Sequence, residues 1–341
     1  MLKTEWKAQG FIDEPVAEGT DLKAEIRRLC REKGAIILAH YYTIGDIQDV
    51  ADFVGDSLAL ARKAAETDAR MMVMCGVHFM AETCKLLSPE KTVLCPDLNA
   101  GCSLADSCKA DDLRKFKAEH PGYQVISYVN TTAAVKALTD VVVTSGNAKK
   151  VVDQLPKDAK LIFGPDYNLG NYINEVTGRH MLLWNGGCHV HERFSVAHIV
   201  ALKKQYPEAV VMAHLECKGA VLAVADVKGS TADMLRYARE NRAKQYIVAT
   251  EAGILHELQR NCPDKVFMPV PPEMSEDGKN IADTAGIGMV SSCSCNECQY
   301  MKMNTLLKIY NCLKHEWPSV EVDAEIAKDA VKPIQRMLEL S

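Results

Sequence analysis

The strongest constraint on the fold is a pattern that occurs three times along the chain. Each copy is a short apolar run, typical of a buried strand, followed at once by a cluster of polar or aromatic residues. The copies are 35–39 before His40-Tyr41-Tyr42, 124–127 before Tyr128-Val129-Asn130, and 209–213 before His214-Leu215-Glu216. The clusters start 88 and then 86 residues apart. Such self-similarity predicts three copies of one supersecondary unit; the competing interpretation is a chance alignment of generic α/β segments.

A hydroxyl residue follows each cluster at the same distance. Ser57, Ser145 and Thr231 stand 17 positions after the first residue of the respective clusters. A run of helical character follows each of them, so we expect these residues to be helix N-caps. The matched offsets argue against a chance alignment.

Further strands and helices complete each unit. Second strands are predicted at 71–75, 161–164 and 246–250, and third strands at 92–95, 181–184 and 265–269. Strands that alternate with helices indicate parallel βαβ units, which bind ligands beyond the carboxyl ends of their strands. The predicted fold is therefore α/β, with three similar βαβ modules in a pseudo-threefold arrangement around a central site. The expected modules are 20–112, 113–205 and 206–310, and a C-terminal helical tail, 311–341, is expected to pack on one of them.

Composition narrows the class of function. The hydrophobic and charged fractions, 48% and 25%, are ordinary for a globular protein. A net charge of −5 gives no electrostatic reason to expect a nucleic-acid or anionic-membrane partner. The N-terminus lacks a signal-length apolar stretch, and no later segment is long enough to span a bilayer. We therefore expect a cytoplasmic protein that acts on small molecules.

The thirteen cysteines suggest metal binding, because an odd number in a reducing compartment favours free thiols over disulfides. Cysteines follow the third strand of each unit: Cys102, then Cys188, then the group Cys293, Cys295 and Cys298. One thiolate from each module would hold a cubane iron–sulfur cluster with one iron left open for Lewis-acid dehydration. One alternative is a zinc site formed by the last group alone, which lacks a nearby fourth ligand. Another is ligation by the neighbouring Cys95, Cys108 or Cys217.

Local motifs along residues 34–304 resemble those of the quinolinate synthase family. They are 38–42, 55–58, 79–83, 96–105, 128–131, 164–170, 214–217 and 298–304. The resemblance implies three α/β domains around a [4Fe-4S] cluster. It also implies condensation of iminoaspartate with dihydroxyacetone phosphate to quinolinate, phosphate and water in NAD biosynthesis, with an aspartate oxidase or dehydrogenase upstream. It selects Cys102, Cys188 and Cys298 as cluster ligands. Some members carry a Cys-x-x-Cys-x-x-Cys run that is capable of forming a disulfide, and the spacing of Cys293, Cys295 and Cys298 departs from it.

Acidic, phosphorylated substrates require anion-binding groups and proton carriers. Ser57, Ser145 and Thr231 at helix starts would offer hydroxyls and backbone N–H groups to anions. Tyr128 and Asn130 are expected to donate hydrogen bonds to a carboxylate.

Four residues are expected to move protons. We expect Glu216 to be the general base and Tyr42 a proton donor or relay. His40 and His214 are expected to bind phosphate or carboxylate and to transfer protons, since imidazole titrates near neutral pH.

Two other functions share some of these features. A different open-iron hydro-lyase would share the cysteines but would release no phosphate from a triose phosphate. A non-catalytic iron–sulfur carrier or sensor would not need the ring of His, Tyr, Asn and Glu side chains. Outside the site, the polar stretch 273–279 is expected to be a mobile loop that gates the cluster. Residues 323–340 are expected to form an amphipathic helix with a kink at Pro333.

Overall fold

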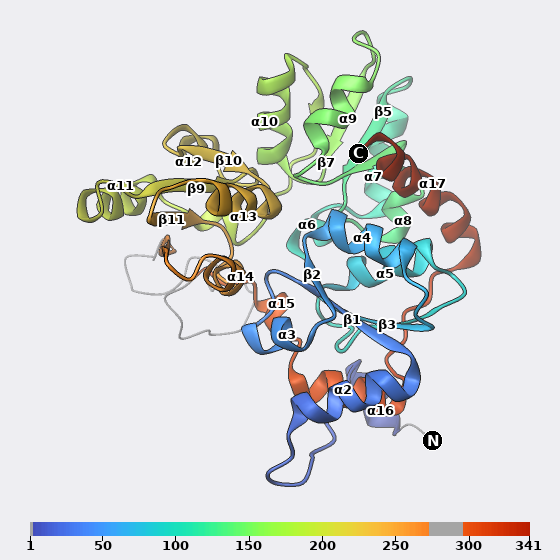
Figure 1. The fold of residues 1–341 in the computed structure, drawn as a ribbon. Helices are drawn as coiled ribbons and strands as arrows, with labels where there is room; N and C mark the ends of the chain where they lie inside the picture. The colour runs from blue at the N-terminus through green and yellow to red at the C-terminus, as the bar shows by residue number, and fades with distance from the viewer. Residues whose placement is uncertain (1–2, 273–295) are drawn as a thin grey trace.

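The structure, a computed structural model, describes residues 3–272 and 296–341. It contains three four-stranded parallel sheets flanked by helices, which confirms the predicted α/β class (Figure 1). The strand orders are β2-β1-β3-β4, β6-β5-β7-β8 and β10-β9-β11-β12. Because all three sheets have the same order, the chain consists of three similar modules, called here the first, second and third module after their sheets.

The first module and its flanking helices occupy the N-terminal third of the chain. Its strands are β1 (Ala35–His40), β2 (Phe53–Gly55), β3 (Met71–Cys75) and β4 (Thr92–Leu94). Its helices are α1 (Thr4–Gln9), α2 (Leu22–Lys33), α3 (Gly45–Val50), α4 (Ser57–Glu66), α5 (His78–Leu87), α6 (Ser103–Ser107) and α7 (Ala110–Glu119).

The second and third modules repeat this order. The second has β5 (Gln124–Tyr128), α8 (Ala133–Lys136), β6 (Val141–Val143), α9 (Ala148–Gln154), β7 (Leu161–Gly164), α10 (Tyr167–Thr177) and β8 (Leu182–Leu183). The 3₁₀ turn η1 (His191–Arg193) and α11 (Val196–Gln205) lead to the third module. The third has β9 (Val210–His214), α12 (Gly219–Ala223), β10 (Val227–Gly229), α13 (Thr231–Glu240), β11 (Gln245–Ala249), α14 (Ile254–Asn261) and β12 (Val266–Pro269). The chain ends with α15 (Gln299–Lys302), α16 (Leu306–His315) and α17 (Ala324–Leu340).

An aspartate in each module shows how closely the repeat is kept. Asp52, Asp140 and Asp226 follow one another at the same 88- and 86-residue spacings. Each carboxylate accepts a hydrogen bond from a backbone N–H of the first strand of its module, at 2.7–2.8 Å. Each Asp N–H in turn donates to the carbonyl of that same strand residue. These reciprocal bonds fix the turn that leads into β2, β6 and β10.

Those three short strands are absent from the sequence-based prediction. β2, β6 and β10 are three residues long and lie at the edge of each sheet. The nine predicted strands are present, although β4 and β8 are only three and two residues long. β1, β5 and β9 each have a neighbour on both sides. After each of these strands the chain first forms the neighbour on one side (β2, β6 or β10) and then the neighbour on the other side (β3, β7 or β11). Their carboxyl ends are therefore topological switch points, where such sheets bind ligands.

The predicted N-caps are wrong by one or two residues. Asp56 and Ser230 cap α4 and α13, because their side chains accept hydrogen bonds from Ala59 N (2.9 Å) and Asp233 N (3.2 Å). Asn147 is the residue before α9. Ser57 and Thr231 are thus the first residues of their helices, and Ser145 lies two residues before its cap. Because Asp56, Asn147 and Ser230 occupy the cap positions, the hydroxyls of Ser57, Ser145 and Thr231 do not cap these helices and can take another role.

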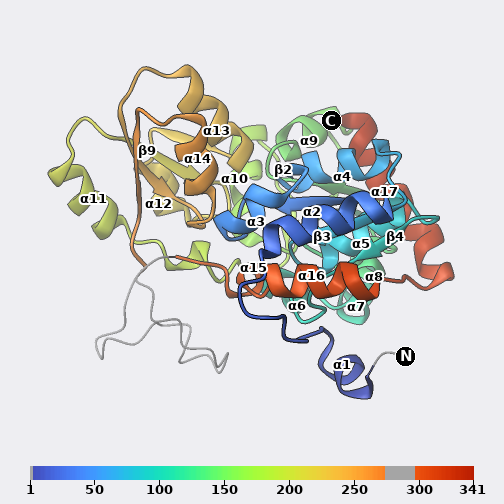
Figure 2. The same ribbon diagram turned by 60° about the horizontal axis from the view of Figure 1, so that its bottom comes forward.

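The C-terminal helices pack on the first two modules. α17 contacts α8, β6 and α9 of the second module and α5 of the first, and it continues through Pro333 (Figure 1). Its Ile334 and Met337 belong to a core cluster that includes residues of both modules. Helix α16 lies against α2 (Figure 2). Among the described helices, none has the length and apolar character that crossing a bilayer requires.

Candidate active site

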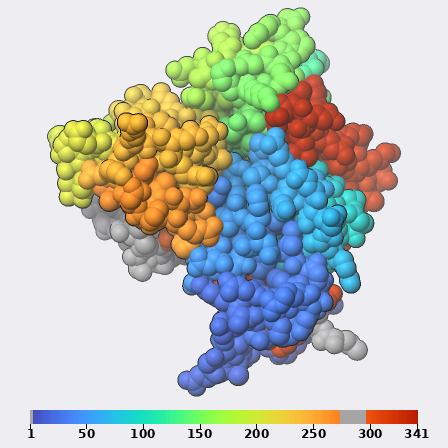
Figure 3. All heavy atoms as spheres, viewed as in Figure 1, coloured from blue at the N-terminus to red at the C-terminus, as the bar shows by residue number. Residues whose placement is uncertain are grey.

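A cavity that offers about 70 Å³ to the centres of water molecules lies where the three modules meet. Figure 3 shows the three modules packed against one another. All twelve residues proposed from the sequence line the cavity: His40, Tyr42, Ser57, Cys102, Tyr128, Asn130, Ser145, Cys188, His214, Glu216, Thr231 and Cys298. His40, Tyr128 and His214 are the last residues of β1, β5 and β9. The equivalent ends of three sheets therefore face one space.

Each of the three cavity cysteines stands at the start of a short helical turn. Cys102 precedes α6, Cys298 precedes α15, and Cys188 lies just before η1. Burial raises the pKa of all three thiols, to about 11 for Cys102 and to about 12 for Cys298. Hydrogen bonds from backbone N–H groups of the following turn lower the same pKa values to a smaller extent. The thiols also affect one another electrostatically, since Cys102 and Cys298 both raise the pKa of Cys188.

The competing cysteines are placed elsewhere or lie outside the described residues. Cys95, Cys108 and Cys217 are buried but do not line the cavity. Cys293, Cys295 and the expected loop at 273–279 lie outside the described residues.

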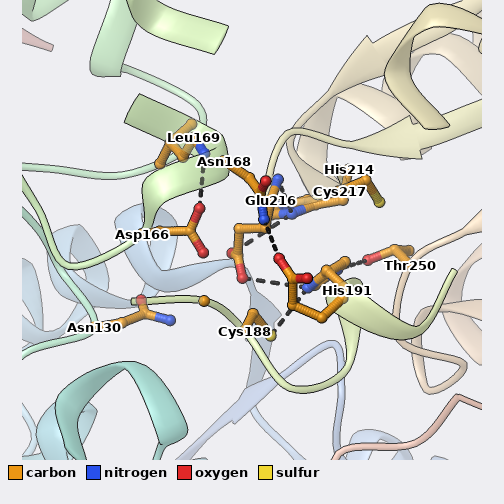
Figure 4. Close-up of polar contacts among 12 residues, drawn as sticks. Asn130, Asp166, Asn168, Leu169, Cys188, His191, His214, Glu216, Cys217 and Thr250 are labelled. Carbon is orange, nitrogen blue, oxygen red and sulfur yellow. Dashed lines mark hydrogen bonds and ion pairs between the residues drawn. The ribbon is translucent and has the colours of Figure 1, made fainter. Parts of the chain in front are cut away.

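Glu216 lies among several polar side chains of the site (Figure 4). It is 4% exposed, and its carboxylate accepts a hydrogen bond from the Tyr128 hydroxyl. Its two oxygens also lie 3.2 Å from His191 Nδ1 and 3.5 Å from His214 Nδ1. Burial acts to raise the pKa of Glu216, but the two imidazoles and the hydrogen bonds from His191 and Tyr128 outweigh it and lower the pKa. The residue is therefore held as a carboxylate.

His191 was not singled out from the sequence, yet it connects the site. Its Nδ1 lies 3.1 Å from Cys188 Sγ, and its Nε2 lies 2.9 Å from Thr250 Oγ1. Thr250 Oγ1 is 2.7 Å from the Tyr42 hydroxyl. A continuous polar chain thus runs from Cys188 to Tyr42, and Figure 4 shows its first three members. The only signal in the sequence is the three-residue spacing from Cys188.

His40 and His214 differ from expectation in their charge. Burial lowers the pKa of His40 to about 3 and that of His214 to about 4. Both rings are therefore neutral at pH 7 and act as hydrogen-bonding groups rather than as cations. The expectation that they titrate near neutral pH considered the residue type without its burial.

Two further buried acids were missed from the sequence: Glu251 lines the cavity, and Asp166 lies close to Glu216. Glu251, beyond β11, accepts hydrogen bonds from Lys302 Nζ (2.8 Å) and from the backbone N–H of Cys298 (3.0 Å). Asp166 caps α10 through one oxygen, and its other oxygen is buried without a hydrogen bond among the described residues. Burial and the nearby Glu216 raise the pKa of Asp166 well above its usual value. Glu251 therefore fixes the segment that carries Cys298, and burial beside Glu216 favours the neutral form of Asp166.

The remaining cavity residues present unused hydrogen-bonding groups. Within the described residues, no hydrogen bond engages the hydroxyls of Ser57, Ser145 or Thr231. Asn130 Nδ2 lies 4.0 Å from Cys102 Sγ, and its Oδ1 is buried without a partner in the described part of the chain. The cavity thus combines three thiols, the acidic side chains of Asp56, Glu216 and Glu251, and several free donors. The free donors suit an anionic ligand.

The chain is similar to proteins of one family over nearly all of its length. Residues 24–339 match the family model described as quinolinate synthetase A protein. The quinolinate synthase of Nostoc sp. is 50% identical over 334 residues, which is 98% of each chain. Those of Chloroherpeton thalassium and Thermosynechococcus vestitus are 50% and 51% identical over 321 residues, covering 94% of this chain and 95% and 96% of theirs. Because the family model covers residues 24–339 and these relatives are about 50% identical over nearly the whole chain, the chain belongs to the quinolinate synthase family.

Proposed function

We propose that this chain is an enzyme that condenses iminoaspartate with dihydroxyacetone phosphate to quinolinate, with release of phosphate and water, in NAD biosynthesis. The observation that carries the proposal is the meeting of three thiols, one from each module or its following segment, with the carboxylate of Glu216 in one cavity. Family membership supports the same assignment.

The donor set fits a [4Fe-4S] cluster held by Cys102, Cys188 and Cys298. The three sulfurs line one cavity, and each faces backbone N–H groups of the turn that follows it. Hydrogen bonds to sulfur are a general means of stabilising such clusters. When bound by three cysteines, a cluster supplies an open iron that acts as a Lewis acid. Because burial keeps the free thiols protonated, loading must release their protons.

Anionic groups of the substrates would bind to the free donors. Ser57 and Thr231 offer hydroxyls together with the N–H groups of the first turns of α4 and α13, where a helix dipole favours negative charge. Ser145 adds a third hydroxyl from the second module. Asn130 offers both halves of its amide, because its Oδ1 has no partner among the described residues. The neutral rings of His40 and His214 contribute N–H groups without adding charge.

Proton transfers would centre on Glu216. Carbon–carbon bond formation and loss of water both require a proton to leave carbon, and a buried carboxylate at the centre of the cavity is suited to accept it. Tyr128, which donates to Glu216, is placed to share that proton. On the other side, Tyr42, Thr250 and His191 form a hydrogen-bonded chain that is suited to deliver a proton to a departing oxygen.

The proposed substrates also imply a partner and a location. Iminoaspartate must come from an enzyme that oxidises aspartate, which would be an aspartate oxidase or dehydrogenase. The eleven described cysteines are all free thiols, which fits a reducing compartment, and we place the enzyme in the cytoplasm.

The proposal is tested by anaerobic purification, iron and sulfide analysis, and an assay for quinolinate from the two substrates. We expect about four irons per chain in the wild type and loss of both iron and activity in Cys298→Ala. Cys217→Ala and Cys108→Ala serve as matched controls, because both thiols are buried but lie outside the cavity. A full cluster without quinolinate would favour another open-iron hydro-lyase, and bound zinc or no metal would overturn the proposal.

A further inference from the structure

Two buried polar side chains lie behind the loops that carry Tyr42 and Asn130. Gln48 is 1% exposed and Lys136 is fully buried, and neither lines the cavity. Gln48 is the fourth residue of α3, and Lys136 is the fourth residue of α8. Burying such groups is unfavourable unless they are hydrogen-bonded, so their partners indicate why they are present.

Both side chains bind the same pair of backbone carbonyls in their own module. Gln48 Nε2 donates to Tyr41 O (2.9 Å) and Thr43 O (2.8 Å), the carbonyls on either side of Tyr42. Lys136 Nζ donates to Val129 O (2.8 Å) and to Thr131 O, the carbonyls on either side of Asn130. In each case one donor group ties together the two ends of a three-residue loop that presents a cavity residue.

The two sets of contacts occupy equivalent positions in the repeat. Positions 41, 43 and 48 become 129, 131 and 136 after the 88-residue offset that separates the first two modules. The position equivalent to Lys136 in the third module, 86 residues later, is Leu222, the fourth residue of α12. Leu222 is buried in the apolar core of that module. The fold of a module therefore forms with an apolar residue there, and the polar residues of the first two modules are not needed for folding as such.

We infer that Gln48 and Lys136 are equivalent positioning residues, which clamp the carbonyls flanking Tyr42 and Asn130 and so set the direction of these two side chains in the cavity. The inference deepens the proposed function. Its activity measurement rests on that function, whereas its hydrogen-exchange measurement does not. Precise placement of a site residue usually depends on such supporting contacts.

The two clamps differ in how much they support. The Tyr42 loop has other contacts, because Lys302 Nζ donates to Tyr42 O (2.8 Å) and the Tyr42 hydroxyl bonds Thr250. Gln48 also reaches Gly253 O (3.0 Å) in the third module. The Asn130 side chain has no contact within hydrogen-bonding range of another described side chain except the 4.0 Å approach to Cys102. Loss of the clamp should therefore affect Asn130 more than Tyr42.

The test is hydrogen–deuterium exchange on the full chain in Lys136→Met and Gln48→Met, which keep side-chain length but remove the donors. We expect exchange in peptides covering 128–132 to become at least about tenfold faster in Lys136→Met, with a smaller change at 40–44 in Gln48→Met. Lys136→Gln gives the second module the glutamine that the first module has at position 48. Because glutamine keeps an N–H donor, protection at 128–132 should be higher than in Lys136→Met and close to that of the wild type. Leu222→Met is the matched control, since Leu222 has no hydrogen-bond donor to lose, and exchange at 214–218 should not change.

Activity adds a second measurement. With iron content unchanged, kcat/KM for quinolinate formation should fall about tenfold in Lys136→Met and stay within about twofold of wild type in Lys136→Gln. Unchanged exchange at 128–132 in Lys136→Met, or faster exchange spread evenly over the chain, would overturn the inference. Failure of Lys136→Gln to restore protection would also overturn it. If even the wild type forms no quinolinate, the proposed function fails while the exchange results still decide the clamp.

Discussion

Glu216 is the residue on which the proposed chemistry depends most directly. Its carboxylate is buried, is held ionised by its neighbours and faces the cavity. Glu216→Gln keeps the shape but cannot accept a proton, so we expect kcat to fall by about 10²- to 10⁴-fold with unchanged iron content. The measurement is steady-state formation of quinolinate under anaerobic conditions.

Glu257→Gln provides the comparison for this variant. Glu257 is also buried, but it lies on α14 and does not line the cavity. Its replacement should leave kcat close to that of the wild type. If Glu216→Gln retained more than about a tenth of the wild-type kcat, the loss would be smaller than removal of a general base usually causes. Another residue would then have to be the general base.

Lys136 should make stability depend on pH in the alkaline range. Burial lowers the pKa of Lys136 from 10.5 to about 8 in the folded chain. Between pH 8 and 10.5 the unfolded chain therefore binds a proton that the folded chain does not, and the free energy of unfolding rises with pH. Relative to Lys136→Gln, the wild type should gain up to about 3 kcal/mol over this window. Urea unfolding at several pH values measures the difference.

The neutral amine keeps N–H donors, so the clamp on Val129 and Thr131 is expected to persist above pH 8. Lys150→Gln, at an exposed position of α9, is the control and should show a difference from wild type that does not change with pH. A wild-type advantage that shrank as pH rose would mean that Lys136 is more stable charged than neutral in the fold.

Residue type and place in the repeat were enough to identify most of the polar side chains that line the cavity. His40, Tyr128 and His214 end recognisable strands, and parallel strands bring their carboxyl ends to one edge of a sheet. His191 lies in a 3₁₀ turn outside any strand pattern, and its role depends on contacts with Cys188 and Thr250 that only the folded chain shows. The neutral state of His40 could not be predicted from the sequence either, because burial in the folded chain lowers its pKa.

Among the helices and strands, the repeated aspartates make a specific contribution to stability. Asp140 accepts a 2.7 Å hydrogen bond from Val125 N and donates its own N–H to Val125 O at 2.9 Å. Asp140→Ala removes the charged acceptor and leaves a buried strand N–H unpaired, so we expect a loss of about 1–2 kcal/mol in the free energy of unfolding. Urea unfolding measures it.

Asp158→Ala is the matched control, because Asp158 is exposed in the loop before β7. Its effect should stay within about 0.5 kcal/mol. Equal losses in the two variants would show that the contact of Asp140 with β5 contributes nothing specific to stability.

The elements that sequence reasoning missed are those with little local signal. β10 reads Val227-Lys228-Gly229, which is too short to show alternation and is paired on one side only. The N-cap error has a similar cause, because Asp56 and Ser57 are both acceptable caps and only the hydrogen bond to Ala59 N distinguishes them. Element type was therefore predictable where apolar runs were long, whereas exact ends required the folded geometry.

At the level of the complete chain, the modules are not joined equally. The first and second modules share one large core cluster, which α17 completes with Ala330, Ile334 and Met337. The third module has two clusters largely of its own. Several of its contacts with the first module are polar, such as Gln48 to Gly253 and His256 to Asp49. The third module is therefore the part most able to unfold separately.

A cluster bound by cysteines associated with all three modules would oppose that separation, since a ligand that binds only the assembled state stabilises it. We expect calorimetry of the iron-loaded chain to show one main transition. Chelation should lower its midpoint and split off an earlier transition that belongs to the third module. Hydrogen exchange during heating would identify the module, because β9 and β11 should lose protection before β1 and β5.

Cysteine variants distinguish the effect of losing the cluster from other effects of the chelator. Cys298→Ala should behave like the chelated wild type from the start, whereas Cys217→Ala, whose thiol lies in the core of the third module, should still gain stability when iron is loaded. If loaded and chelated proteins unfolded in the same single transition, polar and apolar contacts alone would hold the modules together. The cluster would then serve chemistry without contributing to assembly.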